Sequence, residues 1–316
     1  MVVARRHNKN VLRGSFIARA AAIIAFVLAA SCMWTLSKGE TNPQENMIIK
    51  TDTDDGPSRM KTDTDIAIRY KYQPPSTTHS NSVDCGASPG YEQFFSLDYL
   101  QRSRENEDKN LYERFFSKHL HDDGFKGTYV ELGAFDGVRE SNSRFYDECL
   151  GWTGLLIEGN PTMYGKLVEN RPNTHRMSFA PSCVEEGQTV QFLTRTFTNA
   201  GLDGHADPPG PRDDVPCGPL GPILENIFPD GHIAFFSLDV EGSERLVLDT
   251  IDFDKIRIDV FMIEVVNNLC KAHEECEVRN KVRAKMKEVG YMRVGAGGVR
   301  QSDVYVHPDS PYVVDA

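Results

Sequence analysis

Two segments combine acids and glycines at spacings that suit the binding of a nucleotide-like cofactor. They read YVELGAFDG at residues 129–137 and LLIEGNP at residues 155–161. In α/β sheets such cofactors are held at the carboxyl ends of successive strands. We expect Glu131, Gly133 and Gly137 to shape a loop whose backbone approaches the ligand closely. Glu158, at the end of the second apolar run, would then accept hydrogen bonds from ribose hydroxyls.

The spacing of the first segment differs from the dinucleotide fingerprint. The pattern here is E-x-G-x-x-x-G, in which an acid leads the loop. The G-x-G-x-x-G fingerprint has a third glycine that packs the helix against the strand, and this chain lacks it. The pattern therefore favours S-adenosylmethionine over NAD as the cofactor.

Two later apolar runs also end in carboxylates. The run IAFFSLD ends in Asp239, with Glu241 two residues on, and the run DVFMIE ends in Glu264. Strand ends of an open α/β sheet meet at one crevice, so these acids should converge with Glu131 and Glu158. Asp239 and Glu241 could orient an acceptor hydroxyl, take its proton or bind a divalent cation, and Glu264 would complete the acceptor pocket. The alternative is that each acid caps a helix or faces solvent.

One histidine is a further catalytic candidate. His205 lies in a Gly/Pro/Asp-rich loop from Asn199 to Pro222, where it could act as a general base on a closing loop. The alternative is a solvent-exposed loop histidine. No metal site is predicted, because the aspartates around His205 lack the regular ligand spacing of a calcium loop and no cysteine-histidine set suits zinc. A divalent cation at the carboxylates has no other support in the sequence.

The charge distribution excludes one class of partner. The 316 residues carry a net charge of −11, yet residues 1–19 hold five basic residues and no acid. Removing those five positive charges leaves −16 on the remainder. An acidic globular part repels phosphate backbones, so we expect no nucleic-acid substrate. A small-molecule, sugar or peptide acceptor fits better, and the oligomeric state cannot be read from the charge.

The amino-terminal segment predicts a membrane anchor. Residues 20–36 carry no charge and follow the basic tail of residues 1–19, which indicates a cytoplasmic amino terminus and a single-pass type II protein. Residues 37–88, rich in Thr, Asp, Pro, Ser and Asn, read as a flexible stem. Residues 89–316 would then form a catalytic domain in the lumen of the endoplasmic reticulum or Golgi. Two alternatives are a cleaved signal peptide, which would make the protein secreted, and an organelle transit peptide.

Short apolar runs that alternate with helical patterns predict an α/β fold with a mostly parallel sheet. The strand from Asp303 to Val306 could be the antiparallel edge strand. Residues 188–196 suggest an edge strand or a hairpin with the strand before them. The other expected strands are residues 127–132, 154–158, 176–182, 233–239, 259–264 and 291–294, and the expected helices are residues 108–119 and 273–289 with further ones starting near Ser141, Pro161 and Glu244.

Six of the seven cysteines follow the hydrophobic segment, and an even number permits up to three disulfides in an oxidising compartment. The preferred local pair is Cys270 with Cys276. A pair of Cys183 with Cys217 has weaker support. The alternative is that several remain free buried thiols.

Taken together, several ordered motifs between about Gly127 and His307 resemble the FkbM-type methyltransferases. They are VELGAFDG at 130–137, GWTGLLIE at 151–158, VPC at 215–217 and SLDVEGSE at 237–244. The resemblance implies a Rossmann-like methyltransferase fold with helices on both faces of the sheet. It also implies S-adenosylmethionine-dependent methylation, commonly of hydroxyl oxygens on sugars or natural products. The cofactor-binding residues it implies are Glu131, Gly133, Ala134, Asp136 and Gly137 near the methionine, Glu158 and Asn160 near the ribose, and Ser182 and Cys183 near the adenine.

The family also contains membrane-anchored, Star-like proteins of animals with roles in trafficking, and this chain resembles their layout of anchor, stem and lumenal domain. A non-catalytic interaction protein is therefore the alternative function. The change from the usual Glu-Pro-Asn-Pro to Glu158-Gly159-Asn160-Pro161 loosens one turn and leaves the ribose ligand in place.

Overall fold

The computed structural model describes residues 67–76, 83–119, 125–194, 201, 210–266, 276–295 and 299–312. The chain divides into two units, Met1–Asp55 and Gly56–Ala316, and every element below belongs to the second unit. Among the described residues no helix has the length and apolar character to cross a membrane. The expected anchor at residues 20–36 lies outside these residues.

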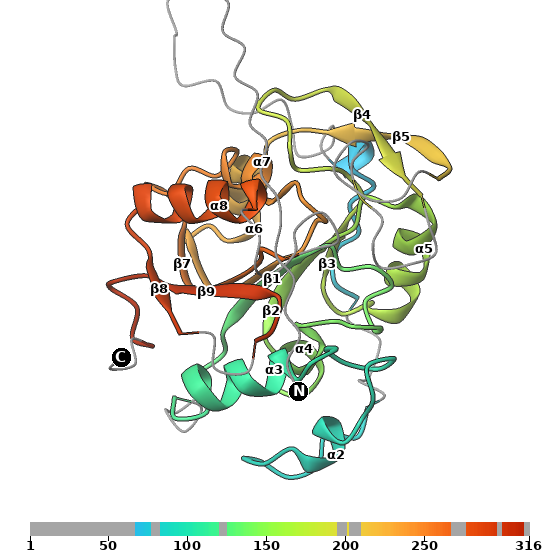
Figure 1. The fold of residues 1–316 in the computed structure, drawn as a ribbon. Coiled ribbons are helices and arrows are strands. Elements are labelled where there is room, and N and C mark those ends of the chain that lie inside the picture. Colours follow the sequence, from blue (N-terminus) through green and yellow to red (C-terminus); the bar gives the residue numbers. More distant parts are fainter. Residues whose placement is uncertain are drawn as a thin grey trace, which may run out of the picture. The chain divides into compact units, whose positions relative to one another are not determined.

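A seven-stranded sheet forms the centre of the second unit (Figure 1). Its strand order is β3-β2-β1-β6-β7-β9-β8, and β9 alone among these seven strands runs antiparallel to the rest. The bounds are β1 Thr128–Leu132, β2 Thr153–Ile157, β3 His175–Met177, β6 His232–Leu238, β7 Arg257–Glu264, β8 Met292–Val294 and β9 Ser302–Val306. The predicted α/β, mostly parallel fold is confirmed.

Alternate side chains of the buried strands pack into two separate hydrophobic cores, one on each face of the sheet. Along β1, Val130 and Leu132 join one core and Tyr129 joins the other, as the period of two dictates. The first core packs on α6, α7 and α8, and the second packs on α3, α4 and α5. The helices are α2 Glu92–Phe95, α3 Glu107–Leu111 with the π-helical turn η1 Tyr112–Phe116, α4 Arg144–Glu148, α5 Pro161–Asn170, α6 Gly221–Ile227, α7 Glu244–Leu248 and α8 Glu277–Glu288.

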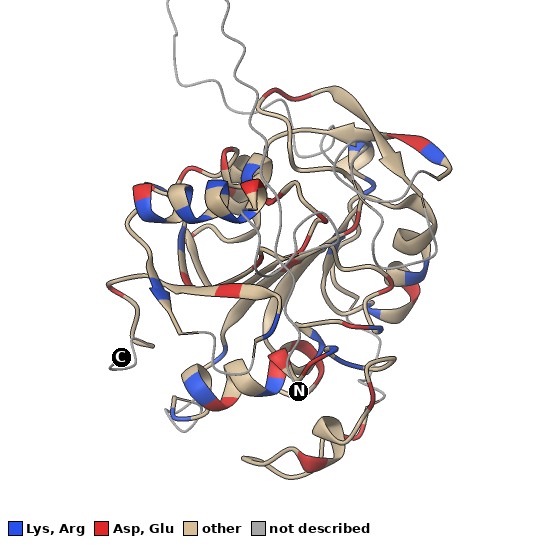
Figure 2. Cartoon of the chain, in the orientation of Figure 1, with Lys and Arg blue, Asp and Glu red and all other residues tan. Residues whose placement is uncertain are grey.

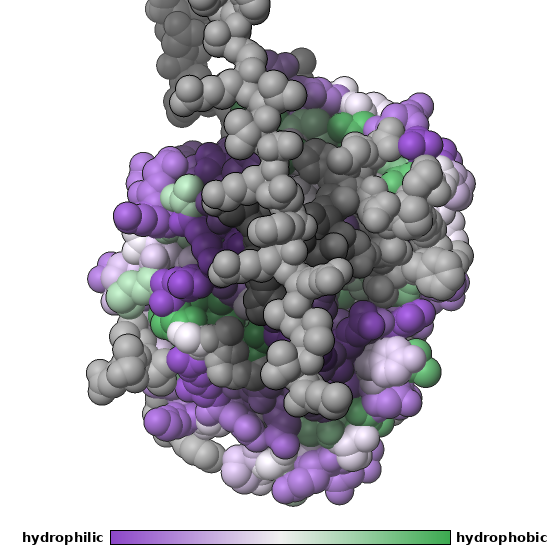
Figure 3. All heavy atoms as spheres, viewed as in Figure 1, coloured by the Kyte–Doolittle hydropathy of each residue, from purple (hydrophilic) through white to green (hydrophobic). Residues whose placement is uncertain are grey.

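The charged and polar residues lie mainly on the surface, outside these two cores. The described surface in Figure 3 is mainly hydrophilic with scattered apolar areas, as expected for a face exposed to water. Basic residues are conspicuous along α8 (Figure 2), which buries only Val282 and Met286 and leaves its charged side in solvent. α8 is therefore held mainly by the apolar stripe of Val282 and Met286, which packs into the first core.

Two strand predictions need correction. The strand Ser302–Val306 is antiparallel, as expected, but lies between β7 and β8, so β8 forms the edge. Residues 188–193 form β4, an edge strand as one of the two alternatives proposed, but it pairs with β5 at Arg212–Cys217 in a separate two-stranded sheet and forms no hairpin with the strand before it. The sequence RDDVPC has low strand propensity, and a proline is tolerated because β5 is an edge strand. Cross-strand pairing over a long connection is what makes β5 a strand.

The folded part begins before residue 89. Tyr70, inside the expected stem, is 2% exposed and stacks on Phe179 with ring centroids 4.3 Å apart. The backbone of Gln73 exchanges hydrogen bonds with that of Arg176. The segment around Tyr70 therefore belongs to the folded domain, although most of its neighbours in the sequence are polar.

Two disulfides lie within the described residues. Cys183 is bonded to Cys217, as the less favoured prediction proposed, and this bond ties β5 to the segment after β3. Cys85 is bonded to Cys149 across 64 residues, a pair that spacing alone did not indicate. The preferred pair with Cys276 involves Cys270, which lies outside the described residues.

Candidate active site

A cleft opens at the carboxyl ends of β1, β2 and β6. The empty space within it, including the part open to solvent, is about 870 Å³. β1 lies between β2 and β6 in the sheet, so the cleft sits where the strand order reverses, which is where open α/β sheets bind ligands. Of the predicted site residues, it is lined by Glu131, Gly133, Ala134, Glu158, Ser182 and Asp239.

The loop after β1 depends on Gly133 for its path. Gly133 has φ +87°, and a Cβ there would lie 1.8 Å from the carbonyl oxygen of Asp239. The amides of Gly133 and Ala134 both donate to the carbonyl of Ile157, at 3.0 and 3.1 Å. The glycine thus lets the loops after β1 and β6 approach each other, in addition to opening space for a ligand.

Glu158 follows β2 and is held by backbone amides. Its two carboxylate oxygens accept hydrogen bonds from the amides of Phe135, at 2.7 Å, and Asn160, at 2.6 Å. The side chain is 5% exposed, and burial raises its pKa to about 7 against the lowering effect of both amides. Each oxygen retains a second lone pair for a ligand hydroxyl. The geometry fits the predicted ribose acceptor.

Glu131 has a different setting from Glu158. One of its oxygens accepts from the hydroxyls of Ser141 and Ser143, at 2.8 and 2.6 Å, and the other from the amide of Asn142, at 2.7 Å. Burial raises its pKa. Glu131 lines the cleft, yet most of its hydrogen-bonding capacity holds the 141–143 segment against the sheet. It therefore positions the wall of the cleft.

Three predicted cofactor residues do not line the cleft and have structural partners instead. An oxygen of Asp136 accepts from the amides of Val138 and Arg139, which closes the turn. A Cβ on Gly137 would lie 2.5 Å from Leu167, so this glycine allows close packing on α5. Asn160 is the N-cap of α5 and accepts from the amide at 162, at 3.1 Å.

Of the two residues predicted to contact the adenine, one lines the cleft and the other has a structural partner. Ser182 lines the cleft, whereas the sulfur of Cys183 is bonded to Cys217 and the residue does not line it. The aromatic part of the lining comes from three residues that were not predicted from the sequence: Phe135, Phe179 and Phe192. Only the period-two pattern of β4 pointed to Phe192, and nothing in it identified the cleft.

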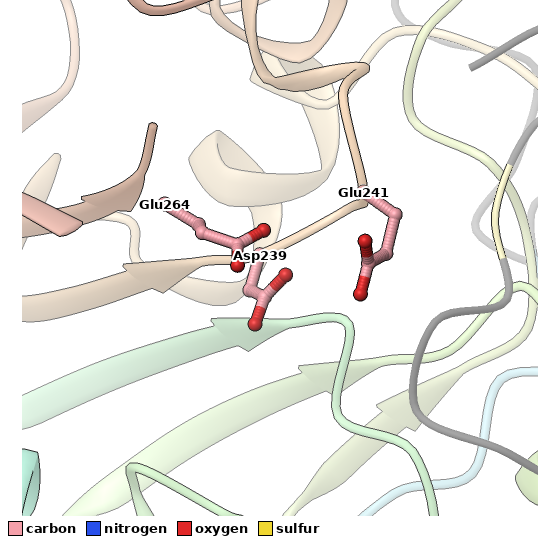
Figure 4. Close-up of side chains that lie close together, drawn as sticks. All are labelled: Asp239, Glu241 and Glu264. Atoms are coloured by element: carbon pink, nitrogen blue, oxygen red, sulfur yellow. The ribbon is translucent and has the colours of Figure 1, made fainter. Parts of the chain in front are cut away.

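The three carboxylates of Asp239, Glu241 and Glu264 form a cluster beside the cleft (Figure 4). One oxygen of each lies within 4.8 Å of the others. Asp239 follows β6 and lines the cleft, Glu241 has φ +57° in the next turn, and Glu264 is the last residue of β7. The predicted convergence at these strand ends is therefore present, although neither Glu241 nor Glu264 lines the cleft itself.

Burial and mutual repulsion set the protonation of this cluster. Burial, followed by the charges of Asp239 and Glu244, raises the pKa of Glu241 to about 8. Burial, then the charges of Asp239 and Glu241 and a hydrogen bond shared with Asp239, raise the pKa of Glu264 well above its usual value, and burial also raises the pKa of Asp239. A carboxyl group whose pKa is raised toward neutral pH, as that of Glu241 is, suits proton exchange with a ligand hydroxyl.

The turn that carries the cluster is organised by a fourth acid. Glu244, fully buried at the start of α7, accepts from the amides of Val240 and Gly242, at 3.2 and 3.0 Å. Burial raises its pKa to about 7. Nearby, the buried hydroxyl of Ser243 lines the cleft without a hydrogen-bond partner among the described residues. His205 lies outside the described residues, so its predicted role stays a prediction.

A comparison with curated protein sequences found no match. Among solved structures, the chain is similar to precorrin-6Y C5,15-methyltransferase from Geobacter metallireducens, with a TM-score of 0.33 and 14% identity over 70% of this chain and 95% of that one. It is also similar to CalS10, an amino pentose methyltransferase from Micromonospora echinaspora, with a TM-score of 0.34 and 8% identity over 64% of this chain and 91% of that one. Both scores are too low to bear on function.

The family model described as the methyltransferase FkbM domain matches residues 131–292, just over half of the chain. The match begins at the acid that leads the loop after β1 and includes Glu158 and the carboxylate cluster. The chain belongs to the FkbM family of S-adenosylmethionine-dependent methyltransferases.

Proposed function

We propose that the protein transfers the methyl group of S-adenosylmethionine to a hydroxyl oxygen of a sugar or another small acceptor. The observation that carries the proposal is the position of Glu158. It is a buried carboxylate at the end of β2, fixed by two backbone amides and lining the cleft. A second set of carboxylates begins with Asp239 at the end of β6. Donor and acceptor would thus meet above the end of β1, which lies between β2 and β6.

The charge of the cleft supports a cationic donor. Four carboxylates line it, those of Glu131, Glu140, Glu158 and Asp239, against one guanidinium, that of Arg139. Arg139 is itself paired with Glu140 at 3.4 Å. An acidic wall attracts the sulfonium and ammonium groups of S-adenosylmethionine and repels phosphate-rich ligands.

The chemistry needs alignment and a base. The acceptor oxygen attacks the methyl carbon, the carbon–sulfur bond breaks, and sulfur keeps the electron pair to give S-adenosylhomocysteine. The proton of the acceptor passes to a carboxylate, for which Asp239 is placed best because it alone of the cluster lines the cleft. The phenylalanines of the lining would hold the adenine by apolar contact.

We also propose the cellular setting that the sequence predicts. Residues 20–36 would anchor the protein as a single-pass type II membrane protein, with the domain in the lumen of the endoplasmic reticulum or Golgi. The acceptor would then be a glycan or small molecule in that compartment, and the donor would have to be imported.

The test is transfer of a labelled methyl group by the full-length protein. Methyl-tritiated S-adenosylmethionine is incubated with a panel of free sugars and glycoconjugates. We expect label in a methyl ether, which resists mild alkali, and loss of transfer in Asp239→Asn with donor binding retained. Alkali-labile label would indicate a carboxyl acceptor and contradict the proposal. Donor binding without transfer to any acceptor would favour the non-catalytic, Star-like alternative.

A further inference from the structure

We infer that Asp239, Glu241 and Glu264 form a binding site for a hard divalent cation at the acceptor side of the cleft. The three side chains come from the end of β6, the turn after it and the end of β7, and they point toward one another in Figure 4. All their donor atoms are carboxylate oxygens, the ligands that calcium and magnesium prefer.

The size of the gap suits a metal ion. The three oxygens lie within 4.8 Å of one another, so a point midway between them is at most about 2.8 Å from each. Calcium binds oxygen at about 2.3 to 2.6 Å, so each ligand would need to close by at most a few tenths of an ångström. Magnesium, at about 2.0 to 2.1 Å, would need a larger closure.

A second observation points to a ligand at this place. Glu264 is 8% exposed, and its side chain shares a hydrogen bond with Asp239, while no N–H or hydroxyl group of the described residues donates to its Oε2 atom. A buried carboxylate oxygen left unpaired is costly, and most such atoms are satisfied by a donor or an ion. Because the side chain is directed into the cluster, a cation there would satisfy it.

The cluster also lacks a counter-charge from the protein. None of the ion pairs between described residues includes Asp239, Glu241 or Glu264. Two other buried acids have a cation, since Asp108 pairs with Arg102, and Asp147 pairs with Arg171 at 2.8 Å. Glu131, Glu158 and Glu244 have no ion pair among the described residues either, but backbone amides and hydroxyls donate to their carboxylates. A divalent ion would remove the repulsion that three neighbouring carboxylates otherwise impose.

The site suggests the kind of acceptor, an extension that rests on the proposed methyl transfer. Three protein oxygens leave at least three positions of a six-coordinate ion for other oxygens. Neighbouring hydroxyls of one acceptor could occupy two of them, which would orient the attacking oxygen and help it lose its proton. An acceptor with vicinal hydroxyls, such as a sugar, fits this arrangement.

The experiment measures cation binding without donor or acceptor. Full-length protein freed of metal with a chelator is titrated with calcium and, separately, magnesium in a calorimeter. We expect one saturable site per chain and at least a tenfold weaker dissociation constant in Glu264→Gln. Glu158→Gln makes the same chemical change in a similarly buried residue outside the cluster, and it should bind the cation like the wild type.

Folding is checked by thermal melting of each variant, and Glu241→Gln, which is only half-buried, is the second variant if Glu264→Gln does not fold. No saturable binding by the wild type, or equal binding by the wild type and both cluster variants, would overturn the inference. The proposed function is judged separately, because S-adenosylmethionine binding can be measured on the same chelated samples. Donor binding without cation binding would reject the metal site alone.

Discussion

Replacing Glu158 by glutamine tests the assignment of the donor site most sharply. The change keeps the size of the side chain but removes its charge, and it places an amide N–H₂ opposite one of two backbone donors that now lie 2.6 and 2.7 Å from the carboxylate. A hydrogen bond to a charged group contributes about 1.5 to 3 kcal/mol. We expect donor binding to weaken by about 2 to 3 kcal/mol, which is roughly a 30- to 150-fold rise in the dissociation constant.

The pH dependence gives the same variant a second readout. Because burial raises the pKa of Glu158 to about 7, the wild type must release a proton to bind the ribose hydroxyls at acidic pH. Donor affinity should therefore fall by up to about tenfold between pH 8 and pH 6. The glutamine variant should lack this part of the pH dependence, while effects of other titrating groups and of the ligand remain in both proteins.

The assay is calorimetry with S-adenosylmethionine on the full-length protein, and Glu264→Gln is the matched control. Glu264 is 8% exposed against 5% for Glu158 and also ends a strand region, but it does not line the cleft. Its variant should bind the donor within about twofold of the wild type. Unchanged affinity in Glu158→Gln, or equal losses in both variants, would refute the division of the site into donor and acceptor sides.

Three further predictions concern the framework of the site. Gly133 has φ +87°, and an added Cβ would lie 1.8 Å from a carbonyl oxygen, so Gly133→Ala should lower the free energy of unfolding in urea by more than about 2 kcal/mol. Gly165→Ala is the control: α5 has open space there, and the change should raise the free energy of unfolding by up to about 1 kcal/mol. The pKa of Glu244, about 7 in the folded protein and about 4.5 when unfolded, means that the folded state holds this proton more tightly. The free energy of unfolding should therefore fall by about 3 kcal/mol as the pH rises from 4.5 through 7. The melting temperature of Glu244→Gln should depend less on pH than that of the wild type, and an equal dependence would contradict this prediction. Opening the Cys85–Cys149 disulfide, which closes 64 residues, should cost up to about 4 kcal/mol, and an unchanged melting temperature in Cys85→Ser would show that the bond does not stabilise the fold.

The sheet was predictable because its buried strands are continuous apolar runs. β1, β2, β6 and β7 are close to their expected bounds, since a parallel strand covered on both faces needs such a run. β5 was not predictable, because RDDVPC gains its strand conformation only by pairing with β4. The packing of Tyr70 was hidden for a similar reason: one buried aromatic in a polar stretch depends on a distant partner.

The candidate site was also predictable only in part. Convergence of acids at the strand ends follows from topology alone, and Asp239, Glu241 and Glu264 do lie together. The hydrogen-bond partners of each carboxylate could not be predicted from the topology, because they depend on where the loops pack against the sheet. The fixing of Glu131 by the 141–143 segment is the main example, and only the serines of that segment hinted at it.

The decisive experiment is the binding of S-adenosylmethionine and S-adenosylhomocysteine to the full-length wild-type protein at pH 8. We expect saturable binding of both ligands with one site per chain and a rise in melting temperature with ligand concentration. A folded protein that shows neither heat of binding nor a shift in melting temperature at millimolar ligand would contradict it.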